Sequence, residues 1–269
     1  MKIPKTEECF LDLKNDWLTV WFNRANKRNS LSKGLLKDIN QTLDFIKDQP
    51  SIRGTIFRGK GSVFCAGADL KWMQNIASEK NSTSDLAMEM SIEFGELFTK
   101  ISNSPKVTIS VVEGACIAGA IGIACASDFL ITTSDAKYAL TETKIGLTPA
   151  QIAPYVIAKV GLGIGRKLML LGNVFDGAEA HSIGMADYVV KESINLDSQI
   201  SQLMNDIKKC SPNALDVTKK VLNSYHNINT TQAAKLFSEC IIHEEGREGF
   251  ASFFEKRKPS WDEKEKNEV

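Results

Sequence analysis

The stretch Gly61-Ser-Val-Phe-Cys-Ala-Gly-Ala-Asp-Leu70 and its counterpart Gly114-Ala-Cys-Ile-Ala-Gly-Ala-Ile-Gly-Ile-Ala124 decide the fold of this chain. Each is rich in Gly and Ala, follows an apolar run typical of a strand, and leads into helix-compatible sequence. Small residues at a strand-to-helix turn let the main chain approach a ligand closely and direct N–H groups toward it. Two such turns can converge on one oxygen atom, as stabilisation of an enolate or oxyanion requires. The pair therefore predicts a site for a polarised carbonyl, with a thioester as the best candidate.

Strands and helices are expected to alternate around these two turns. Apolar and β-branched runs predict strands at 16–23, 54–57, 107–112, 129–132 and 138–140. Apolar residues at helical spacing predict helices at 35–46, 86–101 and 119–126, and from Pro149 onward the pattern is mostly helical. This order predicts an α/β fold, with a core over residues 1–200 and a helical region over 201–269. The charge-dense end of the chain, from Glu255, is expected to fray.

Composition narrows the classes of function. The 269 residues have 43% apolar content, and 33 basic side chains balance 33 acidic ones, so no net field favours nucleic acid or an anionic membrane. The apolar stretch 115–127 is too short to span a bilayer, and residues 1–8 lack the apolar run of a secretory signal. Six scattered cysteines without C-x-x-C spacing favour free thiols in a reducing cytoplasm. Three histidines, none paired at ligand spacing, give no reason to expect a metal site.

Main-chain amides of the two turns are the candidate oxyanion donors. In the first turn these are the amides near Ala66 and Ala68, although a simple tight turn explains the same residues. In the second turn Gly119 begins a predicted helix, where the helix dipole also favours negative charge. Close packing of a small-residue helix is the alternative explanation there. Both roles are compatible.

Glu142 is the candidate proton-transfer group. It lies in Tyr138-Ala-Leu-Thr-Glu-Thr-Lys-Ile-Gly-Leu-Thr-Pro149, after a short apolar run and before a Gly/Pro turn. A carboxylate in a partly apolar pocket has a raised pKa, which suits proton exchange near neutrality. Spacing alone favours the alternative of a surface Glu142 paired with Lys144.

Two hypotheses of nucleophilic catalysis have less support in the sequence. Cys65 lies beside the first turn, but the amino-terminal half of the chain contains no His that would activate a thiol nucleophile. Ser127 and Asp128 suggest two members of a triad, but a capping or turn role fits their place after the predicted helix better.

Taken together, the motifs resemble one known family. The chain contains Asn23-Arg24, Phe64-Cys-Ala-Gly-Ala-Asp-Leu70, Gly114…Gly119, Glu142…Gly146…Pro149 and Phe254-Glu-Lys-Arg257. They occur in the order of the enoyl-CoA hydratase/isomerase (crotonase) superfamily, from about residue 10 to 261. Three further stretches look closest to bacterial methylglutaconyl-CoA hydratases of leucine breakdown: 67–73, 145–150 and 249–257.

The resemblance implies a fold, a ligand and a set of contacts. It implies a spiral core of ββα units, a helical carboxyl-terminal trimerisation region, and a homotrimer or dimer of trimers. An acyl-CoA is the implied substrate, with no further cofactor, and its thioester oxygen would be held by the amides of Ala68 and Gly119. The implied CoA-binding residues are Ala66, Ala68, Asp69, Leu70, Lys71, Gly119, Phe253 and Lys256. For Lys256 a solvated basic tail is the alternative, and Trp72 and Met73 are expected to wall the acyl pocket.

The sequence departs from the family at one catalytic position. Typical hydratases of this family use two glutamates, and Glu142 matches one, whereas Gly122 stands at the position of the other. Glu113, Glu89 and Glu93 are weak candidates to replace it. Hydration of an α,β-unsaturated acyl-CoA, most of all the 3-methylglutaconyl thioester, is the leading hypothesis. The alternatives are an enoyl-CoA isomerase with one base, and an acyl-CoA-binding protein without turnover.

Overall fold

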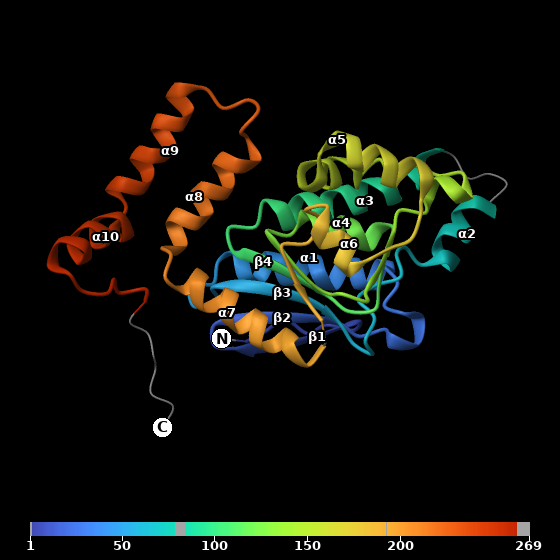
Figure 1. Ribbon diagram of the computed structural model, residues 1–269, viewed down its shortest axis with the longest axis horizontal. Helices are drawn as coiled ribbons and strands as arrows, with labels where there is room; N and C mark the ends of the chain where they lie inside the picture. Colours follow the sequence, from blue (N-terminus) through green and yellow to red (C-terminus); the bar gives the residue numbers. More distant parts are fainter. Residues whose placement is uncertain (1, 79–83, 192, 263–269) are drawn as a thin grey trace.

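A six-stranded sheet forms the centre of the computed structural model, which describes residues 2–78, 84–191 and 193–262 (Figure 1). Its strands, in spatial order, are β1 (Cys9–Lys14), β2 (Trp17–Phe22), β3 (Gly54–Gly59), β4 (Val107–Val112), β6 (Phe129–Thr133) and β9 (Tyr188–Val190). The first pair is antiparallel and all later pairs are parallel. All six residues of β4 are buried, as expected for a central parallel strand covered on both faces. A smaller sheet joins β5 (Ala115–Ile117), β7 (Lys137–Ala139) and β8 (Phe175–Asp176).

Helices cover both faces of the large sheet. The larger apolar cluster contains side chains of α1 (Lys33–Lys47), α3 (Ser84–Ser102), α4 (Gly119–Ala126), α5 (Ala153–Leu171) and α6 (Gly177–Ser182). A second cluster lies on the other face, where Val107, Ile109 and Val111 of β4 pack with α7 (Leu196–Lys208). The alternation of β4 side chains between the two faces thus builds two cores. Short 3-10 turns, η1 (Ala25–Lys27), η2 (Glu142–Ile145) and η3 (Ser193–Asn195), and helix α2 (Leu70–Ser78) complete the core.

Three further helices, α8 (Pro212–Asn223), α9 (Thr230–Ile242) and α10 (Glu244–Glu255), project from the core as an arm (Figure 1). The Lys219 ammonium of α8 ties the arm to the core, because it donates to Asp128 Oδ2 at 2.6 Å and to Lys106 O at 3.0 Å. The arm exposes large aromatic side chains, namely Phe237, Phe250, Phe253 and Phe254. An arm with this much exposed apolar surface has the composition of an interface.

The predicted α/β core with a helical carboxyl-terminal region is confirmed. The predicted strands at 16–23, 54–57, 107–112, 129–132 and 138–140 correspond to β2, β3, β4, β6 and β7. The division predicted after residue 200 falls within α7, whose Leu203 and Ile207 pack in the same cluster as Ile200. In the part of the chain described here, no helix combines the length and apolar character needed to cross a membrane. The frayed end predicted from Glu255 extends into 263–269, outside the described residues.

Candidate active site

The two glycine- and alanine-rich turns lie side by side. The Phe64 N–H donates to Glu113 O at 2.9 Å, the Cys65 N–H donates to Ala115 O at 2.9 Å, and the Ile117 N–H donates back to Cys65 O at 3.1 Å. Gly67 has φ +88°, and a Cβ atom there would lie 2.8 Å from Ile117 O. Only glycine therefore permits this approach of one turn to the other.

In each turn one of the predicted oxyanion donors has an amide hydrogen without an acceptor among the described residues. Among residues 2–78, 84–191 and 193–262, neither the Ala68 N–H nor the Gly119 N–H donates a hydrogen bond, and both residues are half-buried. Their chain neighbours are engaged, since the Asp69 N–H donates to Leu31 O at 2.9 Å and the Ala118 N–H donates to Ala139 O at 2.9 Å. The Ala66 amide is also engaged, with Arg28 O at 3.0 Å, and so is not a free donor. Of the three predicted donors, Ala68 and Gly119 are therefore free, and Ala66 is not.

Ala118 carries backbone strain at the entrance to α4. Its φ of 52° and ψ of −121° lie in a region that residues other than glycine rarely adopt. This conformation sets the plane of the peptide bond to Gly119, and the same peptide carries the free N–H at the positive end of the α4 dipole. Strain of this kind gathers at functional sites because the surrounding structure must hold it.

Glu142 presents a buried carboxyl group without a counter-charge. The residue begins η2 and is 9% exposed, and its Oε2 has no hydrogen-bond partner within the described chain. Burial raises the pKa of this carboxyl above its ordinary value. No ion pair links it to the exposed Lys144 among the described residues, so the surface-pair alternative is wrong. A carboxyl of raised pKa in an apolar setting suits proton transfer.

Comparison with known proteins identifies the family. The model of the enoyl-CoA hydratase/isomerase family matches residues 13–264. The chain belongs to this family. Human mitochondrial methylglutaconyl-CoA hydratase is 28% identical over 253 residues, which are 91% of this chain and 73% of that protein. Crotonyl-CoA hydratase of Syntrophomonas wolfei is 28% identical over 265 residues, which are 95% of this chain and 98% of that protein. The crystal structure of an enoyl-CoA hydratase/isomerase from Marinobacter aquaeolei has a TM-score of 0.90 and 33% identity, and the match covers 95% of this chain and 99% of that one.

As a member of the enoyl-CoA hydratase/isomerase family, the protein is an enzyme with a crotonase fold, as predicted. The curated hydratases that it matches and the solved hydratase/isomerase structure make a hydratase-type enzyme the coarse functional assignment.

An aromatic ring packs against Gly122, the position at which the resemblance implies the other family glutamate. A Cβ atom on Gly122 would lie 2.6 Å from Phe98 Cε2 and 2.8 Å from Phe98 Cε1, and nearer still to Cζ. Phe98 is 1% exposed and packs with Phe94 at a centroid distance of 6.3 Å and with Tyr155 at 6.0 Å. The glycine is thus part of a helix-to-helix contact, and no side chain fits at this position while the ring stays.

The three alternative acids are either paired with a cation or exposed. Glu113 is committed to an ion pair with Arg58 at 3.0 Å. Glu93 is half-buried and lies 3.9 Å from the Lys33 ammonium, and Glu89 is exposed. Of the four candidate glutamates, Glu142 is thus the one whose residue is buried and whose Oε2 has no partner in the described chain.

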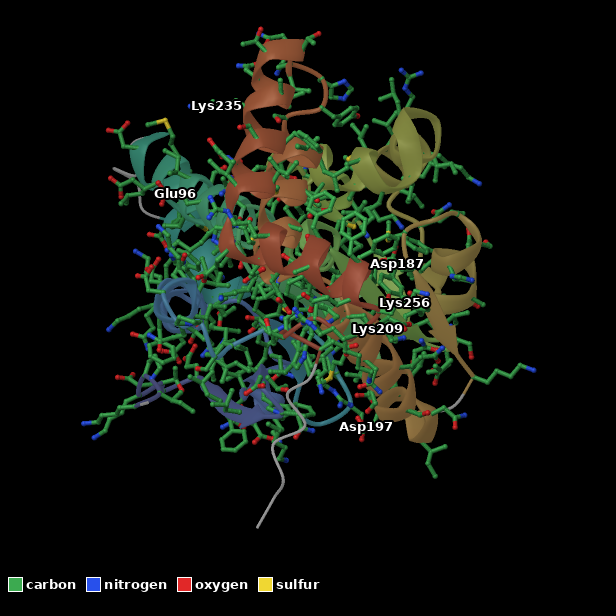
Figure 2. The ribbon with its side chains drawn as sticks, turned by 90° about the vertical axis from the view of Figure 1, so that its left-hand side faces the viewer. Glu96, Asp187, Asp197, Lys209, Lys235 and Lys256 are labelled. Carbon is green, nitrogen blue, oxygen red and sulfur yellow. The ribbon has the colours of Figure 1, made fainter. Side chains whose placement is uncertain are left out.

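The predicted CoA-binding residues fall into two separate groups. Leu70 and Lys71 are exposed at the start of α2, next to Ala68, whereas Asp69 is paired with Arg24 at 3.0 Å and accepts the Lys71 N–H at 3.0 Å. Phe253, 77% exposed, and Lys256 lie on the arm, which Figure 2 views face-on. The arm and α2 occupy opposite ends of the molecule in Figure 1, so a single chain does not bring the two groups together.

The side chains considered for nucleophilic catalysis have structural partners. Cys65 is fully buried, and desolvation raises the pKa of its thiol to about 12, which disfavours the reactive thiolate. The Ser127 hydroxyl lies 2.9 Å from the Ser110 hydroxyl, and Asp128 binds Lys219. In the described part of the chain no cluster of three or more His, Cys, Asp or Glu side chains is placed to hold a metal ion.

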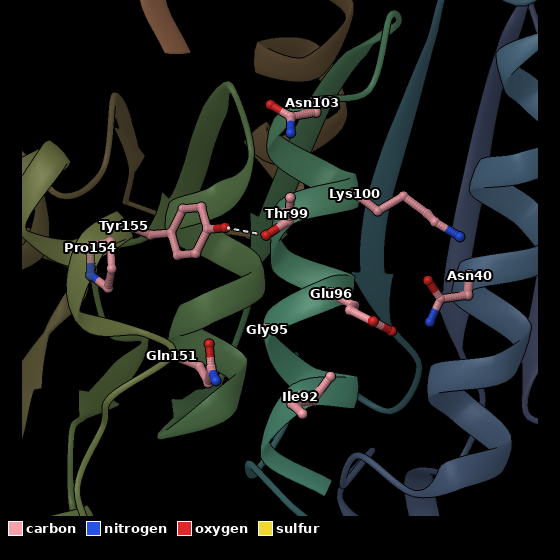
Figure 3. Close-up of a pocket in the computed structure, with 10 residues that line it drawn as sticks. All are labelled: Asn40, Ile92, Gly95, Glu96, Thr99, Lys100, Asn103, Gln151, Pro154 and Tyr155. Atoms are coloured by element: carbon pink, nitrogen blue, oxygen red, sulfur yellow. Dashed lines mark hydrogen bonds between the residues drawn. The ribbon is translucent and has the colours of Figure 1, made fainter. Parts of the chain in front are cut away.

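A groove of about 860 Å³ runs along the outer face of α3 and is separate from this site (Figure 3). Asn40 of α1 lies on one side, and Gln151 and Tyr155 lie on the other, with the Tyr155 hydroxyl 3.2 Å from the Thr99 hydroxyl. None of the predicted site residues lines it.

Proposed function

We propose that the protein adds water to the double bond of an α,β-unsaturated acyl-CoA thioester. One observation supports this most: two adjoining turns each leave a half-buried amide hydrogen free, and the same chain buries a carboxyl group, Glu142, without a counter-charge. Two amides suit the negative charge that grows on a thioester oxygen, and the carboxyl suits the proton that must move.

In the proposed reaction the Ala68 and Gly119 N–H groups donate to the thioester oxygen. Water adds to C3, its C–O bond forms, and the electron pair of the double bond moves toward the carbonyl to give an enolate. The Glu142 carboxylate takes the proton released by the water, and the carboxyl then gives a proton to C2. One carboxyl group can do both and returns to its starting state. Loss of one oxyanion donor costs about 3 kcal/mol of transition-state stabilisation in comparable sites.

We further propose 3-methylglutaconyl-CoA as the substrate, with no cofactor besides the CoA of the substrate. Support comes from the motifs at 67–73, 145–150 and 249–257, and from the similarity to human methylglutaconyl-CoA hydratase. Trp72 stacks on Phe94 at 5.8 Å, and Phe94 Cε1 lies 3.8 Å from a Cβ built on Gly119. This contact supports a place for Trp72 in the acyl wall.

The direct test follows the product and the ultraviolet band of the enoyl thioester across short, branched and dicarboxylic enoyl-CoA esters. Hydration removes the band and adds the mass of one water to the product. Glu142→Gln keeps the size of the side chain but removes its acid–base function, and we expect kcat to fall at least about 100-fold, the lower end for general acid–base catalysis. Unchanged turnover in Glu142→Gln would refute the role given to this residue.

A second candidate reaction is isomerisation of an enoyl-CoA, and the Phe98 ring at Gly122 favours it. A shift of the double bond needs one base that removes a proton from one carbon and returns it to another, and no second carboxyl. The same assay decides between the two reactions, because isomerisation leaves the mass of the thioester unchanged. Tight binding of acyl-CoA with neither product would indicate a binding protein without turnover.

We also propose that the enzyme acts as a homotrimer or a dimer of trimers in the cytoplasm. The exposed aromatic side chains of the arm support an interface between copies. Phe253 and Lys256 would then reach a CoA-binding site formed by another copy. Sedimentation of the protein gives the mass that tests the assembly.

A further inference from the structure

The segment 24–31 holds the first turn on both sides of Ala68. The Ala66 N–H donates to Arg28 O at 3.0 Å, the Leu31 N–H donates to Gly67 O at 2.8 Å, and the Asp69 N–H donates to Leu31 O at 2.9 Å. These bonds fix the residues before and after Ala68 but leave its own N–H free. The direction of that N–H therefore depends on where the segment 24–31 lies.

Asn29 is the buried centre of this segment. It is 0% exposed, and its side chain uses both kinds of polar atom: Nδ2 donates to Lys60 O at 2.9 Å and to Val63 O at 2.6 Å, and Oδ1 accepts the Arg24 N–H at 2.9 Å. One amide side chain thus links the start of the first turn to the end of β2. A buried polar group with all its partners present fixes geometry, and its loss leaves main-chain carbonyls unpaired.

The backbone of the segment is shaped to present this side chain. Arg28 has φ 50° and Asn29 has φ 53°, two consecutive left-handed residues of which neither is glycine. Among residues other than glycine, Asn tolerates this conformation best, because its short polar side chain bonds locally. The Arg28 conformation places its carbonyl where it accepts the Ala66 N–H.

An ion-pair network closes the segment from outside. Arg24 Nη2 lies 3.0 Å from Asp69 Oδ2, and Arg24 Nε lies 3.2 Å from Glu8 Oε1. Asp69 follows Ala68 directly, so the network holds the far side of the turn. The first turn is thus held by Asn29 before Ala68 and by Arg24 after it.

We propose that Asn29 is a positioning residue for the oxyanion site: its amide side chain, acting through Lys60 O, Val63 O and the Arg28 carbonyl, holds the Ala68 N–H in line with that of Gly119. The proposal rests on the proposed function, since it assigns to Ala68 the thioester oxygen as acceptor. Without the amide, the turn 60–69 loses its anchor to the segment 24–31. The Ala68 N–H then no longer keeps a fixed direction.

The test uses Asn29→Gly, since glycine adopts the left-handed backbone without strain and removes only the side-chain bonds. We expect kcat to fall about 10- to 100-fold, below the 100- to 1,000-fold cost of deleting an oxyanion donor, with a smaller change in KM. Asn29→Asp keeps the Oδ1 acceptor and removes the donor amide, so it serves as a second variant with the same expected direction. Asn26→Gly is the matched control in the same segment, where the side chain is exposed.

A spectroscopic readout separates positioning from general loss of structure. The infrared stretch of a saturated acyl-CoA labelled with carbon-13 at the thioester carbonyl is measured free and bound. In the wild-type protein and in Asn26→Gly we expect a shift to lower frequency, and in the Asn29 variants a smaller shift in the bound fraction. A full wild-type shift with unchanged kcat in folded Asn29→Gly or Asn29→Asp would overturn the role of Asn29 alone. Absence of any shift in the wild-type protein would overturn the oxyanion site itself, and the role of Asn29 with it.

Discussion

Two residues of the candidate site, Ala118 and Glu142, have energetically unfavourable features. Ala118 keeps a backbone conformation suited to glycine, and Glu142 keeps a carboxyl group away from water and from any counter-charge in the described chain. Backbone strain of this kind costs about 1–3 kcal/mol. In the proposed reaction, the Ala118 conformation would direct the Gly119 amide hydrogen, and burial would raise the proton affinity of Glu142.

Replacement of Ala118 by Gly is expected to stabilise the protein. Relief of strain, about 1–3 kcal/mol, exceeds the entropic cost of a glycine, about 0.5–1 kcal/mol, so the free energy of unfolding should rise by about 1 kcal/mol. Ala120→Gly, in the same helix but without strain, is the control and should lower it by about 1 kcal/mol. Urea unfolding measures both, and equal losses in the two variants would contradict the assignment of strain.

Because the Glu142 carboxyl is buried, we expect the difference in stability between wild type and Glu142→Gln to depend on pH. Burial raises the pKa of Glu142 in the folded state above the ordinary value of 4.5. The protonated carboxyl therefore makes its full contribution to the free energy of unfolding below the unfolded-state pKa, and this contribution is lost as the pH rises through the folded-state pKa. Glu142→Gln does not titrate. We therefore expect the variant to gain stability relative to wild type as the pH rises above about 4.5. A difference that is constant across this range would show that burial does not perturb the carboxyl.

At the scale of elements, the sequence predicts helices and strands whose pattern lies within one segment, and it does not predict contacts between two elements. The six apolar or small residues of β4 and the small-residue helix α4 are readable because each pattern lies within one element. The antiparallel edge strand β1 and the three-residue strands β5 and β9 have no pattern of their own, since their partners define them. The candidate site divides in the same way. Glu142 and the two turns follow from local sequence, but the Phe98 ring over Gly122 depends on how α3 packs against α4.

Replacement of glycine by alanine is expected to have opposite effects on stability at Gly122, where α4 packs against α3, and at Gly163 in α5. An alanine in place of a helical glycine normally adds up to about 1 kcal/mol. At Gly163 no atom lies within 4 Å of a built Cβ, and we expect part of that gain, because the residue is two positions after the non-helical Gly161 of α5. At Gly122 the Phe98 ring must move, and we expect a net loss of about 1–3 kcal/mol. Thermal or urea unfolding measures both, and a gain at Gly122 would show that the ring yields freely.

At the scale of the whole molecule, a core that holds the candidate site carries an arm attached through few polar contacts. Lys219 is 9% exposed and binds Asp128, whose carboxylate also accepts the Thr108 N–H at 2.7 Å. One ion pair thus connects α8 to the start of β4 and the end of α4. The position of the arm depends on this connection and on Asn223 of α8, whose amide donates to Ser102 O at 3.0 Å and to Asn103 Oδ1 at 2.9 Å.

Removal of the Lys219 ammonium is expected to loosen the arm. Lys219→Ala leaves Asp128 partly buried without its cation, and loss of one partner of a buried pair costs about 3–5 kcal/mol. Lys220→Ala is the matched control, because its pair with Asp216 is exposed and is worth about 0.3–0.5 kcal/mol. Hydrogen exchange of 212–223 should rise in Lys219→Ala alone. Equal protection of α8 in both variants would refute the anchoring role.

The ring of Phe98 against Gly122 also constrains how this lineage can change over time. If an acidic residue arose at position 122 while Phe98 was retained, the resulting protein would fold poorly. A smaller side chain at position 98 would first open the space that a carboxylate at position 122 could then occupy. The two codons are therefore expected to vary together among descendants, with the change at 98 preceding the change at 122.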